Sequence, residues 1–205
     1  MDGSDQRMLC SWCALRVFTD GKRQAGSFSV LTAFFHTGVP RELIIRLKYS
    51  GEKRLSSTLA GLALCSWHKK PAQGDSIVPV PVSHSKMRSR GFNQTLLIAR
   101  EIEKLTGARV VRFLRRASGS SQVGSTAGER KRNVSGAFLP GLKSIPSGRI
   151  WLLDDVMTTG ATMREACTVL SDAGAEHFHP AVVCFRNTQD ESIIDHKEVA
   201  DEGVE

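Results

Sequence analysis

The spacing of apolar residues predicts four helices. Leucine, isoleucine and alanine recur every three or four positions, which places them on one face of a helix. Pro40 fits the first turn of the first helix, and Gly107 fits the position just after the third. The helices are expected over residues 40–51, 53–67, 92–106 and 162–173.

Short apolar runs between these helices predict strands. The run Ile150-Trp151-Leu152-Leu153 is apolar at every position, as a strand buried on both faces should be. Further strands are expected at 77–82, 109–114, 134–139 and 181–185. Residues 1–35 show little clear periodicity. The order strand, helix, strand over 150–185 indicates parallel strands joined by a helical crossover, and hence an α/β fold.

Length and composition are those of one globular domain with appendages. The chain has 205 residues, of which 24% are charged. No apolar stretch approaches the roughly 20 residues of a membrane span, so no membrane insertion is expected. The polar, acidic start does not look like a signal peptide. Five cysteines then favour free or metal-bound thiols in a reducing compartment, and we expect a cytoplasmic protein.

The net charge of +7 is unevenly distributed. Residues 187–205 hold seven acids and one lysine, a net of −6, so the rest of the chain carries +13. Residues 188–205 are expected to form a disordered acidic tail. A body this basic suits an anionic partner such as phosphate, a nucleotide or nucleic acid. A solvated basic face explains the charge equally well.

The densest chemical signal follows the strand at 150–153. Two acids, Asp154 and Asp155, come directly after it. A loop then opens a helix, and it consists of Val156, Met157, Thr158, Thr159, Gly160, Ala161 and Thr162. Ligands bind at the carboxyl ends of parallel strands, and loop N–H groups at a helix start bind phosphate. The carboxylates suit sugar hydroxyls or Mg²⁺. The pattern suggests a ribose 5-phosphate site; simple helix capping is the plainer alternative.

Several motifs of the sequence resemble those of a known family. The run from Leu153 to Thr162 resembles the phosphoribosyl pyrophosphate (PRPP) loop of type I phosphoribosyltransferases. With Val78-Pro79-Val80-Pro81 and the stretch Arg88 to Gln94, it is similar to the ComF/GntX family over roughly residues 36–186. The resemblance implies a type I phosphoribosyltransferase fold over residues 36–187. That fold has a mostly parallel central sheet flanked by helices, with a small N-terminal hood.

The resemblance also implies roles for these residues. Asp154 and Asp155 should be the catalytic carboxylates that hold the ribose hydroxyls of PRPP, bound with Mg²⁺, and residues 158–162 should hold its 5′-phosphate. A second loop, after the first core strand, should bind the pyrophosphate. Its candidate residues are Ser83, His84, Lys86, Arg88, Arg90 and Gly91. Preorganised cations stabilise charge that builds on a departing diphosphate. A solvated loop is the alternative.

Residues 117–133 hold no apolar pattern and are rich in Ser, Gly and charge. Type I enzymes carry a mobile loop at this place, which closes over the substrate and excludes water. The candidate lid residues are Gln122, Arg130, Lys131 and Arg132. An exposed disordered loop is the alternative. No residue stands out as a general base, so the sequence leaves catalysis and the acceptor open.

Cysteine spacing raises the question of zinc. The ComF pattern has two cysteine pairs ahead of the core, which look like a zinc-binding element, whereas this chain has only Cys10 and Cys13 there. Structural zinc takes four ligands. Residues 1–35 are thus a candidate remnant of that element, with Zn²⁺ on this pair. Cys65 and His68 could complete the set, but a cysteine on the apolar face of a helix is more simply buried.

Two functions of different classes follow. The first is a glycosyltransferase of nucleotide metabolism, which transfers phosphoribose from PRPP to an unknown base or amine. The second is a non-catalytic competence protein of DNA uptake, acting on single-stranded DNA or DNA-processing partners, as the ComF resemblance implies and basic charge supports. The basic segment 86–132 holds only Phe92 and Phe113 as aromatics, so no base-stacking platform is evident there. A third hypothesis is a regulator that senses PRPP or a nucleotide.

Overall fold

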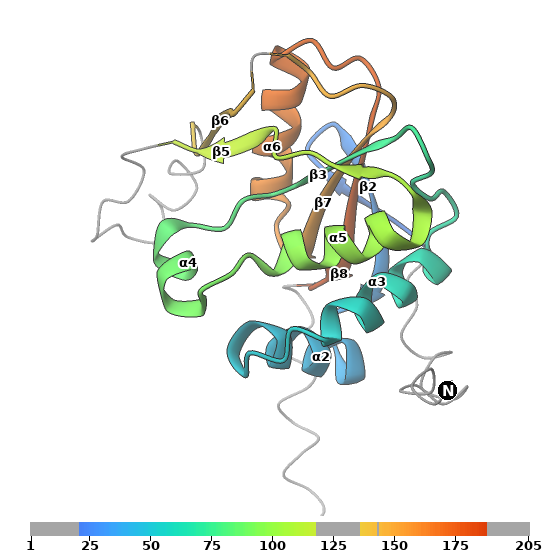
Figure 1. Ribbon diagram of the computed structural model, residues 1–205, viewed down its shortest axis with the longest axis vertical. Helices are drawn as coiled ribbons and strands as arrows, with labels where there is room; N and C mark the ends of the chain where they lie inside the picture. The colour runs from blue at the N-terminus through green and yellow to red at the C-terminus, as the bar shows by residue number, and fades with distance from the viewer. Residues whose placement is uncertain (1–20, 118–135, 143, 188–205) are drawn as a thin grey trace, which may run out of the picture.

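The computed structural model describes residues 21–117, 136–142 and 144–187. Its strands are β1 (Lys22–Ala25), β2 (Phe28–Phe35), β3 (Ser76–Pro79), β4 (Arg109–Val110), β5 (Leu114–Arg116), β6 (Phe138–Pro140), β7 (Ile150–Met157) and β8 (Phe178–Phe185). Its helices are α2 (Gly38–Tyr49), α3 (Leu55–Ser66), α4 (His84–Arg90), α5 (Gln94–Thr106) and α6 (Ala161–Asp172) (Figure 1).

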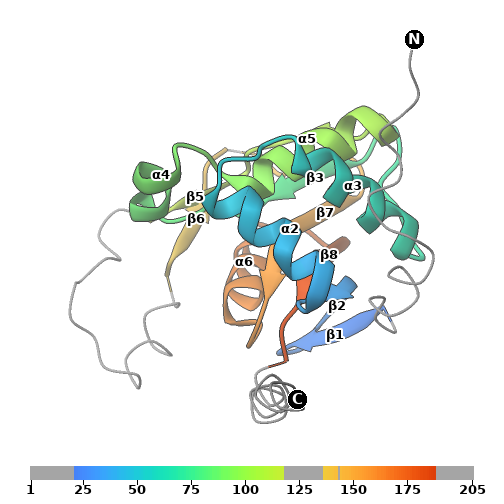
Figure 2. The same ribbon diagram turned by 90° about the horizontal axis from the view of Figure 1, so that it is seen from below.

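One six-stranded sheet organises these elements. Its order is β1-β2-β8-β7-β3-β4, and every neighbouring pair is parallel except β1 with β2. Helices α2, α3 and α5 cover one face and α6 covers the other (Figure 2). Strands β5 and β6 form a separate antiparallel pair. The expected α/β fold with a mostly parallel sheet is confirmed. Within the described ranges, every helix is too short or too polar to cross a bilayer.

Strand β7 shows why the sheet is buried on both sides. Trp151 and Leu153 pack into the core under α2, α3 and α5, whereas Ile150 and Leu152 pack into the core under α6. Successive side chains of a strand point to opposite faces, so a strand between two helix layers must be apolar at every position. The apolar run therefore identified this strand correctly, and the crossover through α6 to β8 is parallel as expected.

Strands β1 and β2 are elements that the sequence pattern did not predict. They lie within residues 1–35, and β2 pairs in parallel with β8 near the middle of the sheet. Residues 30–34 are all buried, including Thr32 at 0% exposure. A threonine in the middle of this run hides its apolar character, although β-branched and aromatic residues favour strands. The sheet therefore extends upstream of residue 36.

Other strand boundaries also differ from the predicted ones. The strand expected at 77–82 ends at Pro79, since the next proline, Pro81, has no N–H to continue the ladder. The run 109–114 is divided between β4 and β5, and the strand expected at 134–139 begins at Phe138.

Helix α3 buries the expected face over its first turns but not at its end. Leu55, Leu59 and Ala63 are buried at a spacing of four residues, but Cys65 is exposed. The expectation that Cys65 is buried was wrong, because the stripe that includes it turns away from the core towards the end of the helix. Its thiol is therefore open to solvent.

A buried carboxylate stabilises the end of the sheet at which β3 begins. Asp75 is 5% exposed, and one of its oxygens accepts hydrogen bonds from the Trp151 indole at 3.0 Å and from the Ala72 N–H at 3.0 Å. Arg149 donates to its other oxygen at 3.1 Å. Burial alone would raise the pKa of Asp75, but these donors hold it below its ordinary value.

Replacing Asp75 by alanine is expected to lower the free energy of unfolding by about 2–3 kcal/mol, because a buried indole N–H would lose its acceptor. Urea denaturation followed by tryptophan fluorescence measures the change. Asp172→Ala, which removes an exposed carboxylate at the end of α6, is the matched control and should change little. Equal stabilities of the two variants would show that Asp75 has no such role.

Candidate functional site

The candidate site is built around the carboxyl end of β7. The sequence pattern placed the two acids at the end of this strand, and the strand continues past them to Met157. Asp154 and Asp155 therefore lie within the strand, with Asp154 opposite Val182 of β8. The sheet thereby fixes the backbone of both acids, which a loop would hold less firmly.

Asp155 is engaged in a buried ion pair. The Lys48 ammonium, near the end of α2, lies 2.5 Å from Asp155 Oδ2, and the Gln94 amide of α5 donates to the same oxygen at 3.3 Å. The side chains of Lys48 and Asp155 are only 16% and 7% exposed. Burial would raise the pKa of Asp155, but the charge and hydrogen bond of Lys48 hold it below its ordinary value.

Asp154 has a different environment, although it is the next residue. Its Oδ1 accepts a hydrogen bond from the Thr95 hydroxyl at 3.3 Å and from the Asp155 N–H at 2.8 Å. Burial and the neighbouring Asp155 charge raise the pKa of Asp154 to about 8. At neutral pH the pair of acids thus carries about one negative charge, which Lys48 balances.

A Thr- and Gly-rich turn connects β7 to α6. Gly160 has φ +73° and precedes the first residue of α6, whose N–H lies 3.4 Å from the Thr159 hydroxyl. The turn surrounds a small hollow of about 40 Å³, which has room for an anionic group but not for a whole nucleotide. Its lining residues are Asp154, Val156, Met157, Thr158, Thr159, Gly160, Ala161, Thr162 and Met163. The structure thus brings the predicted loop residues together at the start of a helix, where N–H groups favour phosphate.

Gly160 is packed so closely that its missing side chain matters. A Cβ on Gly160 would lie 2.9 Å from the Ala25 Cβ of β1, a distance at which one of the two must move. Gly91 offers a matched comparison, because its φ is +75° and a Cβ there would meet nothing within 4 Å. Left-handed backbone alone costs a non-glycine residue about 1–2 kcal/mol.

We expect Gly160→Ala to lower the free energy of unfolding by about 2–4 kcal/mol, and Gly91→Ala by about 1–2 kcal/mol. The difference reports the contact with β1, since both variants share the backbone strain. Chemical denaturation of the two variants measures it. If the two losses were the same, β1 would have room to yield, and the turn would not depend on this contact.

The segment expected to be a pyrophosphate loop is instead the short helix α4. The Ser83 hydroxyl caps it by accepting from the Lys86 N–H at 3.3 Å, and Gly91 ends it with φ +75°. The helix has no buried residue, so it has no apolar stripe that could have predicted it. The prediction of a loop at 83–91 was wrong for this reason.

Among the candidate cations, Arg90 is the one that contacts the site. It donates to the Gln94 side chain at 3.1 Å and to the Tyr49 hydroxyl at 3.2 Å, and its guanidinium stacks 4.8 Å from the Tyr49 ring. Since Gln94 in turn contacts Asp155, a chain of polar contacts joins α4 to the carboxylates. The other candidate residues on this helix, His84, Lys86 and Arg88, are exposed, and within the described residues none of them makes a hydrogen bond or ion pair with the two acids.

Several residues of the site were not predicted to be there. Gln94 ends a stretch used to identify the family, but the sequence pattern gave neither Gln94 nor Lys48 a role in the site. Arg116 of β5 donates to the Pro81 carbonyl at 3.2 Å and lies 4.4 Å from the Phe138 ring. Burial lowers the pKa of Arg116, and the charge of Asp154 opposes this shift. Residues of this kind could have been found only through the motifs next to them in the sequence, because their own spacing follows no pattern.

Helix α5 is positioned by its N-cap residue, Asn93. The Asn93 side chain accepts from the Thr95 N–H at 2.9 Å and from the Leu96 N–H at 3.3 Å, and it donates to the Val80 carbonyl at 3.1 Å. An asparagine cap satisfies N–H groups that a helix start leaves unpaired. This cap also ties the start of α5 to the end of β3. It thereby sets Gln94 and Thr95 against the two acids.

The candidate metal ligands of the described residues are the two aspartates. The described residues contain no group of three His, Cys, Asp or Glu side chains that could hold a metal ion. The two aspartates do supply oxygen ligands, and Mg²⁺ is usually held by one or two carboxylates together with oxygens of a phosphorylated substrate. The donor set therefore fits a magnesium ion that arrives with its ligand. The proposed zinc ligands Cys10 and Cys13 lie outside the described residues. So do the candidate lid residues, which are Gln122, Arg130, Lys131 and Arg132.

A family model and several curated proteins match the sequence of this chain. The family model of the phosphoribosyl transferase domain matches residues 88–202. Competence protein F of Haemophilus influenzae is 28% identical over 164 residues, which cover 75% of this chain and 72% of that protein. DNA utilization protein YhgH of Escherichia coli K12 is 31% identical over 140 residues, which cover 65% of this chain and 61% of that protein.

More distant relatives extend the comparison. Competence protein ComFC of Bacillus subtilis is 23% identical over 145 residues, which cover 70% of this chain and 58% of that protein. Among solved structures, the glutamine PRPP amidotransferase of B. subtilis, complexed with ADP and GMP, is 19% identical with a TM-score of 0.40. The match covers 63% of this chain and 25% of the amidotransferase. The chain thus spans about three fifths of the ComFC and YhgH relatives.

Proposed function

Because the chain belongs to the phosphoribosyl transferase domain family, we propose that it binds PRPP with Mg²⁺ at the carboxyl end of β7. The proposal rests on three neighbouring features: two aspartates within a strand of the sheet, a Thr/Gly turn that surrounds a hollow, and the start of α6. Carboxylates accept hydrogen bonds from vicinal hydroxyls, while the turn and the helix start donate to a phosphate. These two requirements together describe a ribose 5-phosphate.

The ribose hydroxyls would bind where the aspartates now contact Lys48 and Thr95. The Lys48 ammonium must then share Asp155 with the ligand or move away from it. Asp154, whose pKa is raised to about 8, would lose its proton when hydroxyl donors arrive. When bound, Mg²⁺ would place positive charge on the diphosphate, and the carboxylates of Asp154 and Asp155 would help to hold it.

The cations of α4 would face the diphosphate. Arg90 is already held towards the site by Gln94 and Tyr49, while Lys86 and Arg88 are exposed and free to turn. In a transfer reaction, the bond from ribose C1 to the pyrophosphate oxygen breaks and a bond from C1 to an acceptor nitrogen forms. A proton leaves the acceptor to solvent. Fixed cations stabilise the charge that builds on the departing pyrophosphate, so this step needs little from a general base.

The test is a titration of the full chain with PRPP and Mg²⁺ by calorimetry, followed by pyrophosphate release measured across a set of bases and amines. We expect saturable, Mg²⁺-dependent binding. Release with one acceptor would identify the reaction, and binding without release would leave a PRPP-binding regulator. Failure to bind PRPP under any condition contradicts the proposal. Asp172→Asn, an exposed change on α6, should bind as the wild type does.

A second candidate function rests on the names of the relatives. Proteins similar to this chain are called competence and DNA utilization proteins, and we propose that this chain also acts in the uptake or use of DNA. Its basic composition supports contact with DNA phosphates. Affinity for single-stranded DNA measured against salt is the test. A response independent of salt would contradict phosphate contacts, since these must release counterions.

A further inference from the structure

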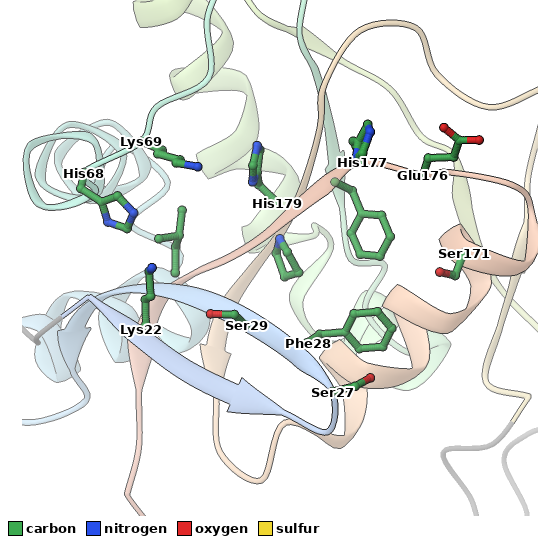
Figure 3. Close-up of a pocket in the computed structure, with 13 residues that line it drawn as sticks. Lys22, Ser27, Phe28, Ser29, His68, Lys69, Ser171, Glu176, His177 and His179 are labelled. Carbon is green, nitrogen blue, oxygen red and sulfur yellow. The ribbon is translucent and has the colours of Figure 1, made fainter.

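A second hollow lies away from the aspartates. A cleft of about 470 Å³ opens at the opposite end of the sheet, where β2 and β8 begin (Figure 3). The β1–β2 hairpin, the residues after α3, the end of α6 and the start of β8 surround it. A volume of this size lies in the range of small-molecule sites, whereas the hollow beside the Thr/Gly turn is about 40 Å³.

One end of this cleft is basic. Lys22 of β1 and the consecutive residues His68 and Lys69 gather there, and the His179 ring faces the same space (Figure 3). They come from three segments far apart in the sequence, so the fold and not a local charge run brings them together. Lys22, His68 and Lys69 are exposed and can reach a ligand. Such a set of N–H donors suits a phosphate.

The other end of the cleft is aromatic. Phe28 of β2 and Phe178 of β8 lie with ring centroids 5.8 Å apart, and both are partly buried. The carboxylate of Glu176 lies on this side, away from Lys22, His68 and Lys69 (Figure 3). Ring faces and edges suit a flat nitrogen heterocycle, and a carboxylate accepts hydrogen bonds from its amino groups. The one acidic residue of the cleft therefore lies apart from the proposed phosphate position.

We propose that this cleft binds a nucleotide unit, with its phosphate at the basic end and its base against Phe28 and Phe178. The arrangement of donors, rings and carboxylate has the polarity of a nucleotide, and the volume accommodates one. The chemistry is shared by two sources, a free nucleotide and one unit of a single-stranded nucleic acid. This site is separate from the proposed PRPP site, because the two hollows lie at opposite ends of the parallel strands β7 and β8.

The test uses the full chain with adenosine 5′-monophosphate and with a short single-stranded oligodeoxyadenylate. The variant Lys22→Glu with Lys69→Glu reverses two cleft charges, and Lys70→Glu with Lys104→Glu makes the same change in net charge at exposed lysines outside the cleft. We expect the cleft variant to bind at least about 10-fold more weakly, and the control within about twofold of wild type. Amide shifts should report the ligand near residues 176–180.

Each outcome decides one point. Binding of the mononucleotide identifies a free nucleotide as sufficient, and binding of the oligonucleotide alone identifies a strand as the source. No binding of either, or equal binding by the cleft variant and wild type, overturns the proposal. The double variant Asp154→Asn with Asp155→Asn should keep nucleotide binding at the cleft. Failure at the PRPP site can therefore be told apart from failure here.

Discussion

The variant Asp154→Asn is expected to be more stable than the wild type and yet to bind Mg²⁺–PRPP at least about 100-fold more weakly. In the folded chain, burial and the Asp155 charge raise the pKa of Asp154 to about 8. Keeping a carboxyl protonated at neutral pH costs stability, and a neutral amide of the same shape removes that cost. We expect a gain of about 1–3 kcal/mol at pH 7.

The stability of the wild type should depend on pH because Asp154 has different pKa values in the folded and unfolded chain. The folded chain holds the Asp154 proton up to about pH 8, while the unfolded chain releases it near the ordinary value of 3.8. Wild-type stability should therefore fall as pH rises from about 4 to about 8, and the variant should lack this component. Urea denaturation at several pH values measures it. A variant no more stable than the wild type at pH 7 would contradict the raised pKa.

The loss of affinity has a separate cause. The ribose hydroxyls need an ionised acceptor, and hydrogen bonds to a charged group contribute about 1.5–3 kcal/mol each. Asparagine can offer one weaker acceptor only. Calorimetry in buffers of different ionisation enthalpy should also find that the wild type releases a proton on binding PRPP near pH 7. The variant Asp172→Asn should change neither stability nor affinity by much, since that carboxylate is exposed.

The sequence predicts those parts of the fold in which burial follows a regular spacing. Helix α5 and strand β7 were correctly placed because their apolar residues recur with the periods of a helix and of a doubly buried strand. Helix α4 has no buried residue and thus no such period. Strand β2 was missed because Ser29 and Thr32 interrupt its apolar run, although Thr32 is fully buried.

The candidate site was predictable only where its residues are adjacent in sequence. Asp154 to Thr162 form one continuous motif around one hollow. Lys48, by contrast, comes from a helix more than a hundred residues upstream, and nothing in the spacing of α2 marks its ammonium as buried. Tertiary packing alone brings it to Asp155. The cleft at the far end of the sheet was missed for the same reason.

Removal of the Lys48 charge is the second change with a large expected effect. We expect Lys48→Met to lower the free energy of unfolding by about 3–5 kcal/mol, because it leaves Asp155 buried without its counter-ion. Asp155→Asn should cost a similar amount by leaving the ammonium unpaired. The double variant should lose clearly less than the two single losses combined, since neither charge is then left alone.

Lowering the pH should reduce the difference in the free energy of unfolding between Lys48→Met and the wild type. In the wild type, Lys48 holds the pKa of Asp155 below 3.8, so this pair contributes stability above that value and loses it as pH falls through the folded pKa. Without Lys48, burial raises the pKa of Asp155 and a proton can neutralise it. The deficit should therefore be largest at neutral pH and smaller near pH 4. Lys104→Met, at an exposed lysine of α5, controls for the loss of one charge. Additive losses in the double variant would show that the two side chains do not stabilise one another.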